Sequence, residues 1–215
     1  MNQRDLAAHA KNRHLSQCGE AGVLDRILQL IGETNKIAVE FGGGDGYNLS
    51  NTRHLSKRGW RVIMFDGNGD DALVYREFIT ANNINELFRK YKVPDEFDVL
   101  SIDIDGNDYW IWKALEARPR VVVMEFNGAI ERSECKTIPY DPEFRHDGTN
   151  YYGASFGLLC KLADEKGYTP VFQLQNLNVF FVRNDMLPGG RRERVFYTQS
   201  HYHPPDTQNR PWVHL

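Results

Sequence analysis

The stretch Val39-Glu40-Phe41-Gly42-Gly43-Gly44-Asp45-Gly46 joins a short apolar run to a glycine-rich turn. Residues 36–41 are typical of a buried strand, and glycines let the chain turn sharply after a strand while a ligand approaches the backbone closely. A second apolar run, 61–65, follows and ends in Asp66. An acidic residue about 20 positions beyond such a turn can accept hydrogen bonds from the hydroxyls of an adenosine ribose. The two features together predict a site for an adenosine-containing cofactor.

Strand-like and helix-like segments alternate along the rest of the chain. Apolar spacing predicts helices over 21–31, 48–58, 84–91, 109–115 and 153–166, and further strands over 99–104, 120–126, 168–174 and 178–182. Such alternation implies parallel strands joined by crossover helices, and the last two strands could pair antiparallel. We therefore expect an α/β, Rossmann-like fold with a mostly parallel seven-stranded sheet, an antiparallel terminal strand and helices on both faces.

The composition is that of one globular domain. The 215 residues are 41% hydrophobic and 26% charged, and a chain of this length usually forms a single domain. We expect that domain to span 1–215, with an irregular tail from about 188 to 215 that is rich in Arg, His, Pro and aromatic residues. The formal charge is 26 − 29 = −3, whereas a nucleic-acid-binding domain usually carries a basic excess. The charge therefore disfavours a nucleic-acid partner.

The apolar runs and the cysteines indicate the compartment. Residues 1–11 are polar and charged, so no secretory signal is expected, and no apolar run approaches the roughly 20 residues that cross a bilayer. Cys18, Cys135 and Cys160 are an odd number without CxxC spacing. This pattern favours a reducing cytoplasm and disfavours a disulfide framework or a zinc site.

The spacing of the glycines separates two cofactors that share an adenosine ribose, NAD and S-adenosylmethionine (SAM). Gly42, Gly44 and Gly46 are spaced GxGxG rather than the GxGxxG of a dehydrogenase turn. Together with the flanking acidic residues, this turn resembles motif I of class I SAM-dependent methyltransferases. The resemblance implies that Glu40 lies near the methionine end of SAM, that the backbone of 42–46 runs beneath the cofactor, and that Asp66 holds its ribose.

Further motifs resemble a bacterial group of small sugar and natural-product O-methyltransferases. They are Ser16-Gln17-x-Gly19-Glu20-x-Gly22, Ser50-Asn51-Thr52, Gly59-Trp60, the acidic strand end 102–110 and Pro139-Tyr140-Asp141-Pro142. The segment that carries the resemblance runs from Ser16 to Arg183, most of the chain. It implies a sugar or oligosaccharide as the methyl acceptor. It also implies that Gln17 and Ser50 contact the methionine carboxylate or amine; helix capping is the alternative role for both.

Acidic residues collect at the ends of two neighbouring predicted strands. Asp103 and Asp105 would share a face if their strand continues, and so would Glu125 and Asn127 at the end of the next one. The carboxyl ends of parallel strands meet at the edge of the sheet where ligands bind. Clustered carboxylates repel one another, and a hard divalent cation with oxygen ligands, such as Mg²⁺, relieves that repulsion. We therefore expect a magnesium site here.

The same two strand ends carry acidic ligands in metal-dependent O-methyltransferases of the catechol and macrolide-sugar kinds, which this region resembles. The chain departs from their commonest pattern because Phe126 separates Glu125 from Asn127, and this leaves the full ligand set open. The alternative interpretation of residues 105–108 is a loop in which Asn107 or Asp108 caps a helix.

His146 is the residue that we expect to act as general base. Methyl transfer from SAM is an in-line displacement at carbon, so the protein must align and deprotonate the acceptor hydroxyl. Imidazole titrates near neutral pH, which suits that task. His146 lies in the polar loop 144–150, a region that covers the acceptor pocket in the class I methyltransferases that the chain resembles.

These observations predict a SAM-dependent, Mg²⁺-assisted O-methyltransferase acting on a hydroxyl of a sugar or a sugar-containing small molecule. The alternatives are a domain that binds SAM without chemistry and a methyltransferase for a non-sugar natural product. A base-modifying N-methyltransferase is a weaker alternative, because residues 104–107 lack the Asn/Asp-Pro-Pro-Tyr/Phe signature. The tail could either close the acceptor pocket or mediate a homodimer.

Overall fold

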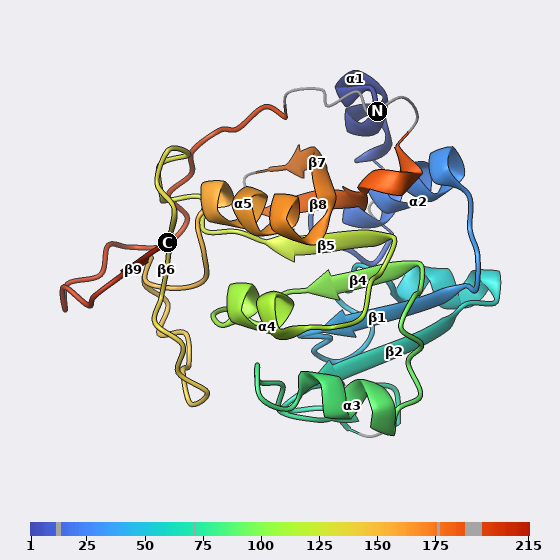
Figure 1. Cartoon of the computed structure of the whole chain (residues 1–215), viewed down its shortest axis with the longest axis horizontal. Coiled ribbons are helices and arrows are strands. Elements are labelled where there is room, and N and C mark those ends of the chain that lie inside the picture. The colour runs from blue at the N-terminus through green and yellow to red at the C-terminus, as the bar shows by residue number, and fades with distance from the viewer. Residues whose placement is uncertain (12–13, 71, 176, 188–194) are drawn as a thin grey trace.

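One mixed sheet organises the residues that the computed structural model describes, which are 1–11, 14–70, 72–175, 177–187 and 195–215. Its strand order is β3-β2-β1-β4-β5-β8-β7 (Figure 1). The strands are β1 (Ile37–Phe41), β2 (Arg61–Asp66), β3 (Tyr75–Arg76), β4 (Val99–Ile102), β5 (Val121–Glu125), β7 (Tyr168–Leu174) and β8 (Asn178–Arg183). The first five pair in parallel, and β8 runs antiparallel to both of its neighbours. The predicted Rossmann-like α/β sheet, with its antiparallel last strand, is confirmed.

Helices cover both faces of this sheet. They are α1 (Gln3–His9), α2 (Glu20–Ile31), the 3₁₀ helix η1 (Arg53–Arg58), α3 (Ile84–Lys90), α4 (Asp108–Ala114), α5 (Phe156–Lys166) and the 3₁₀ helix η2 (Asn184–Met186). Side chains alternate between the two faces along each strand. Ala38 and Val99 therefore join the apolar cluster under α1, α2 and η1, whereas Val39 and Leu100 join the cluster under α3, α4 and α5.

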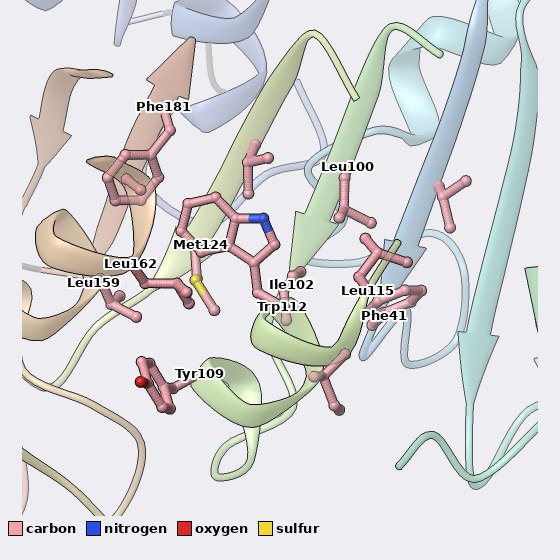
Figure 2. Packing of buried hydrophobic residues seen from close by; sticks show 14 of the residues in the cluster. Phe41, Leu100, Ile102, Tyr109, Trp112, Leu115, Met124, Leu159, Leu162 and Phe181 are labelled. Atoms are coloured by element: carbon pink, nitrogen blue, oxygen red, sulfur yellow. The ribbon is translucent and has the colours of Figure 1, made fainter. Parts of the chain in front are cut away.

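The larger apolar cluster includes Trp112 of α4, one of the largest fully buried side chains. Figure 2 shows its indole among Ile102 and Met124 of the sheet and Phe181 of β8. The indole is 1% exposed, and its ring centroid lies 5.0 Å from that of Phe181. Burial of a side chain of this size stabilises the fold by roughly 1.5–3 kcal/mol, so α4 is held firmly on the strands whose ends carry the predicted site.

Several elements differ from the sequence prediction. The predicted helix over 48–58 is helical only in η1, β4 ends at Ile102 rather than at 104, and α5 begins at Phe156 rather than at 153. The helix α1 and the two-residue strands β3, β6 (Lys136–Thr137) and β9 (Val213–His214) were not predicted. The tail is not wholly irregular, because β9 pairs antiparallel with β6; residues 188–194 of the predicted tail lie outside the described residues.

None of the described helices is long and apolar enough to span a membrane.

Candidate cofactor and metal site

Strand register brings the predicted site residues to one edge of the sheet. β1 pairs with β2 and β4, and β4 pairs with β5, so that their carboxyl ends stop at the same level. The residues at or just beyond these ends are Gly42, Asp66, Asp103 and Glu125. Ligands bind at this edge in open α/β sheets, so the topology alone makes it the candidate site.

The glycines of the turn after β1 have two roles: two of them allow tight packing, and one leaves the backbone exposed. Gly42 has φ +74°, and a Cβ there would lie 1.6 Å from the carbonyl oxygen of Asp103. Gly46 also has a positive φ, and a Cβ there would lie 2.8 Å from the side chain of Val74. Gly44 has φ +53°, but a Cβ there would meet nothing within 4 Å. Gly42 and Gly46 therefore allow the turn to pack tightly, whereas Gly44 presents bare backbone to open space.

Asp66 ends β2 beside this turn. One of its carboxylate oxygens accepts a hydrogen bond from the backbone N–H of Gly44 at 3.0 Å, and the other accepts from the N–H of Asn68 at 2.8 Å. A carboxylate offers about four acceptor positions. Asp66 can therefore hold the turn and still accept hydrogen bonds from a ligand.

Glu40, which the family resemblance places near the methionine end of SAM, is held in a buried hydrogen-bond network. It is 3% exposed, and its carboxylate accepts hydrogen bonds from the hydroxyl of Ser50 at 2.6 Å, the hydroxyl of Thr52 at 2.5 Å and the N–H of Asn51 at 2.7 Å. Burial raises the pKa of Glu40, and these hydrogen bonds lower it only in part. Glu40 and Ser50 thus belong to a buried network that shapes the loop before η1.

Three carboxylates converge at the ends of β4 and β5. Asp103, Asp105 and Glu125 each offer an oxygen, and these oxygens all lie within 4.8 Å of one another. The strand does not continue to Asp105; that residue takes φ +56°, and this turn brings its side chain back to the cluster. Burial, reinforced by the negative charges of its neighbours, raises the pKa of Asp103 and that of Glu125 well above their ordinary values.

Asp108 holds the loop that carries Asp105. Its two oxygens accept hydrogen bonds from the backbone N–H groups of Ile104 and Gly106, each at 2.9 Å. Burial raises the pKa of Asp108 to about 6. The alternative interpretation predicted a loop here with a helix cap at Asn107 or Asp108; the loop is present, but the N-cap residue Asn107 makes no side-chain capping hydrogen bond. The loop coexists with the carboxylate cluster because Asp103 and Glu125 lie outside it.

The side-chain amide of Asn127 forms hydrogen bonds with the backbone of the chain segments around 129 and 150–152. Its amide N–H group donates to the carbonyls of Asn150 and Tyr152, both at 2.9 Å, and its carbonyl accepts from the N–H of Ala129 at 3.0 Å. The side chain is fully buried. We therefore build the candidate metal site from the three carboxylates without it.

A cavity of about 950 Å³ runs along this edge of the sheet. Eight of the sequence-predicted residues line it: Gln17, Gly42, Gly44, Asp66, Asp103, Asp105, Glu125 and His146. Among the described residues, the predicted Glu40, Gly46, Ser50 and Asn127 do not line it. The cavity joins the glycine turn and Asp66 to the carboxylate cluster in one space.

His146 lies on the wall of the cavity. Its Nε2 is 2.8 Å from the carbonyl oxygen of Thr149. A carbonyl can only accept, so Nε2 carries the proton in the neutral ring, and Nδ1 carries the lone pair. The ring centroid lies 4.9 Å from that of Tyr152, whose hydroxyl pKa is raised by burial and by the charges of Glu125 and Asp103. Tyr152 thus packs beside His146 and lies within the electrostatic influence of the carboxylate cluster.

The remaining walls contain residues that the sequence interpretation did not assign to the site. The Arg145 guanidinium lies 4.2 Å from the centre of the Phe78 ring, and both side chains line the cavity. Tyr202 and His203 line it as well; they belong to the tail, for which the sequence left closure of the acceptor pocket and dimerisation as alternatives. Phe78 lies in a turn-rich loop, and the tail shows no apolar periodicity. The sequence therefore carries no local signal that these residues reach the edge of the sheet.

Comparison with known proteins gives distant structural similarities. No protein-family model matches the sequence, and no curated protein matches it. Among solved structures, the chain is similar to the N-terminal domain of EvdMO1 with SAH bound, with 10% identity, a TM-score of 0.47, and coverage of 85% of this chain and 97% of that one. A SAM-dependent methyltransferase from Aquifex aeolicus has 11% identity, a TM-score of 0.37, and coverage of 84% and 97%. Similarities this distant assign no activity to the chain.

Proposed function

We propose that the protein is a SAM-dependent, Mg²⁺-assisted O-methyltransferase that methylates a hydroxyl of a sugar or a sugar-containing small molecule. One observation carries the proposal. A single cavity is lined by a glycine turn and an acidic strand end at one side, and by three converging carboxylates and a histidine at the other. A cofactor that contains an adenosine ribose suits the first set of groups, and a hard cation with an oxygen acceptor suits the second.

The cofactor side fits SAM in its polar groups. The Asp66 carboxylate accepts hydrogen bonds from the N–H groups of Gly44 in the glycine turn and of Asn68 in its own loop, and ribose hydroxyls can donate to its remaining acceptor positions. The open backbone at Gly44 allows a ligand to lie close to the turn. The GxGxG spacing suits SAM better than a dinucleotide, because SAM has no pyrophosphate to be held by a GxGxxG turn.

The carboxylate cluster fits Mg²⁺ in its chemistry. Asp103, Asp105 and Glu125 supply only oxygen, and no cysteine or histidine joins them among the described residues. When bound, SAM would supply a methyl group on a good leaving group, and Mg²⁺ would lower the pKa of the acceptor hydroxyl. In this proposal His146 receives the hydroxyl proton at Nδ1 and its Nε2–H keeps the ring oriented through Thr149.

The choice of a sugar as acceptor rests on the motif resemblance and on the rings around the carboxylates. Tyr152, Tyr202, His146 and His203 line the acceptor side, and such rings can pack against the apolar faces of a sugar. In size and motif set the chain resembles mycobacterial-type methylmannose 1-O-methyltransferases, so a methylated mannoside is the first acceptor to test. We place this activity in the cytoplasm, in keeping with three cysteines that show no CxxC spacing.

An acceptor screen tests the proposal. The purified protein is incubated with SAM and MgCl₂ and with mannose, methylated mannosides, other monosaccharides or phenolic natural products, and the release of S-adenosylhomocysteine (SAH) is measured. We expect release with a sugar, its loss in EDTA, and its recovery with excess Mg²⁺. Release with phenols alone would replace the sugar by another natural product. SAM binding without release in any mixture would favour a scaffold, and no SAM binding would reject the proposal.

A further inference from the structure

The C-terminal strap, residues 195–215, lies against the loop that carries His146. The N–H of Ser200 donates to the carbonyl of Gly128 at 2.9 Å, and the N–H of Asn150 donates to the carbonyl of Pro204 at 2.8 Å. Arg210 contacts Asp147 at 2.9 Å. In Figure 1 the end of the chain lies beside β6. The strap is therefore tied to the acceptor side of the cavity at several points along its length.

The middle of the strap enters the cavity wall. Tyr202 donates from its hydroxyl to the carbonyl of Gln175 at 2.9 Å, and both residues line the cavity. The next residue, His203, also lines it. Its ring centroid lies 4.8 Å from that of His146 with the two planes at 90°, and 5.4 Å from that of Tyr152 at 79°.

Three contacts together fix the ring of His146. Thr149 accepts from Nε2, Tyr152 packs against the ring at 4.9 Å, and His203 packs edge to face at 4.8 Å. The first two partners come from the same loop as His146, only three and six positions further along the chain. His203 comes from the strap, so it is the partner that connects the orientation of His146 to a distant part of the chain.

We propose that His203 is a positioning residue of the active site, which acts by holding the ring of His146 so that Nδ1 is presented to the acceptor hydroxyl. The expected effect of His203 on kcat rests on the proposed function, in which His146 is the general base. The ring packing of His203, rather than a proton on either of its nitrogens, carries the effect. The catalytic site of this chain is therefore completed by its C-terminal strap.

A double-variant experiment tests whether His203 acts through His146. With the sugar acceptor found in the screen, His203→Ala should lower kcat by up to about 100-fold, because a base displaced by about 1 Å loses alignment. The affinity for SAH should not change, because the hydrogen bonds that hold the glycine turn and Asp66 do not involve His203. In a His146→Ala background, adding His203→Ala should cause no further loss. The matched control is His201→Ala, since His201 is an exposed strap histidine outside the cavity lining.

Two further measurements separate positioning from general destabilisation and from failure of the proposed function. His203→Phe keeps an aromatic ring and should recover most of the kcat lost in His203→Ala. Nitrogen NMR of the free protein should show His146 as the Nε2–H tautomer in the wild type and in His203→Phe, but as a mixture of tautomers in His203→Ala. This second readout needs no substrate, so it stands even if no acceptor is turned over.

The proposal is overturned by any of three results. One is a His203→Ala enzyme with wild-type kcat and an unchanged His146 tautomer. Another is a His203→Ala loss that is equally large in the His146→Ala background, since the two side chains would then act independently. The third is a His203→Phe enzyme as slow as His203→Ala, because a nitrogen of His203 would then be required.

Discussion

Two carboxylates beside the same turn, Glu40 and Asp66, show how surroundings decide the task of a residue. Both are acidic positions of the motif that the sequence analysis recognised, yet Glu40 is buried and surrounded by donors of its own chain, whereas Asp66 lines the cavity. Sequence spacing could predict that an acid stands at each strand end. It could not predict that Ser50, Asn51 and Thr52 fold back onto Glu40, because that contact depends on the tertiary path of the loop.

Replacement of Asp66 should weaken cofactor binding. Asp66→Ala removes acceptors for charge-assisted hydrogen bonds worth roughly 1.5–3 kcal/mol, which corresponds to about a 10- to 150-fold loss of affinity. Titration calorimetry with SAH measures it. The control is Asp70→Ala, which removes an exposed carboxylate that also caps a nearby turn but does not line the cavity. Equal SAH affinity in folded Asp66→Ala and Asp70→Ala proteins would remove Asp66 from the site.

Replacement of His146 should affect chemistry rather than cofactor binding. General-base catalysis typically contributes roughly 10²- to 10⁴-fold, so His146→Ala should lower kcat by about that factor. Steady-state kinetics on the accepted sugar, together with SAH calorimetry, separate the two effects. A normal kcat in His146→Ala would exclude His146 as the base, and Asp141 and Asp147 of the same loop would be the next residues to test.

At the scale of elements, strands were easier to predict than the segments between them. The buried strands have continuous apolar runs because helices cover both faces of the sheet. The predicted helix over 48–58 fails at its start, because the N–H groups of Asn51 and Thr52 donate to Glu40 instead of to a helix. The strands β3, β6 and β9 have only two residues each, which is too few for any period to be visible in the sequence.

The glycine turn gives a paired prediction. Gly42→Ala should destabilise the protein by roughly 2–5 kcal/mol, because it combines a left-handed backbone with a clash against the Asp103 carbonyl. Gly44→Ala should cost only about 1–2 kcal/mol of stability, yet weaken SAH binding because the added methyl group occupies open space beside the cofactor. Urea denaturation and SAH calorimetry measure the two effects. A Gly44→Ala protein that binds SAH as tightly as the wild type would show that the turn does not approach the cofactor.

The carboxylate cluster predicts an unusual dependence of stability on pH. Asp103, Asp108 and Glu125 have pKa values above those of ordinary carboxyls, which lie near 4. Their contribution to the stability of the metal-free fold is complete below about pH 4 and is lost as pH rises through the folded values, which for Asp108 is about 6. Mg²⁺ should therefore raise Tm more at pH 8 than at pH 5. At 100 times its Kd the ion adds about 2.7 kcal/mol, or roughly 5–10 °C.

Glu125→Gln provides the control for this pH effect. The variant removes one of the repelling charges, so at pH 8 its metal-free form should melt above the metal-free wild type, while its Mg²⁺-induced shift should largely disappear. Asp70→Asn should change neither quantity, because its carboxylate is exposed and outside the cavity lining. A wild-type Tm shift that is independent of pH, or that survives in Glu125→Gln, would argue against Mg²⁺ binding at the cluster.

At the scale of the whole molecule, the cavity is made from parts that are far apart in the chain. The sheet edge contributes Asp66, Asp103 and Glu125, and its position could be predicted because parallel strands align their carboxyl ends. The opposite wall comes from the 144–152 loop and the strap, whose contacts are hydrogen bonds and ring packing between irregular segments. No local pattern encodes such contacts, so the sequence left open whether the tail closes the acceptor pocket or mediates a homodimer, and it did not single out His203.

The most direct test is the crystal structure of the protein with SAH and Mn²⁺, in which anomalous scattering locates the ion that stands in for Mg²⁺. We expect one cavity with the SAH ribose hydroxyls on Asp66 and an anomalous peak bound by Asp103, Asp105 and Glu125, with oxygen ligands near the roughly 2.1 Å that is usual for such small divalent cations. SAH bound away from the glycine turn, or a manganese ion bound elsewhere while the three carboxylates stay free, would contradict this expectation.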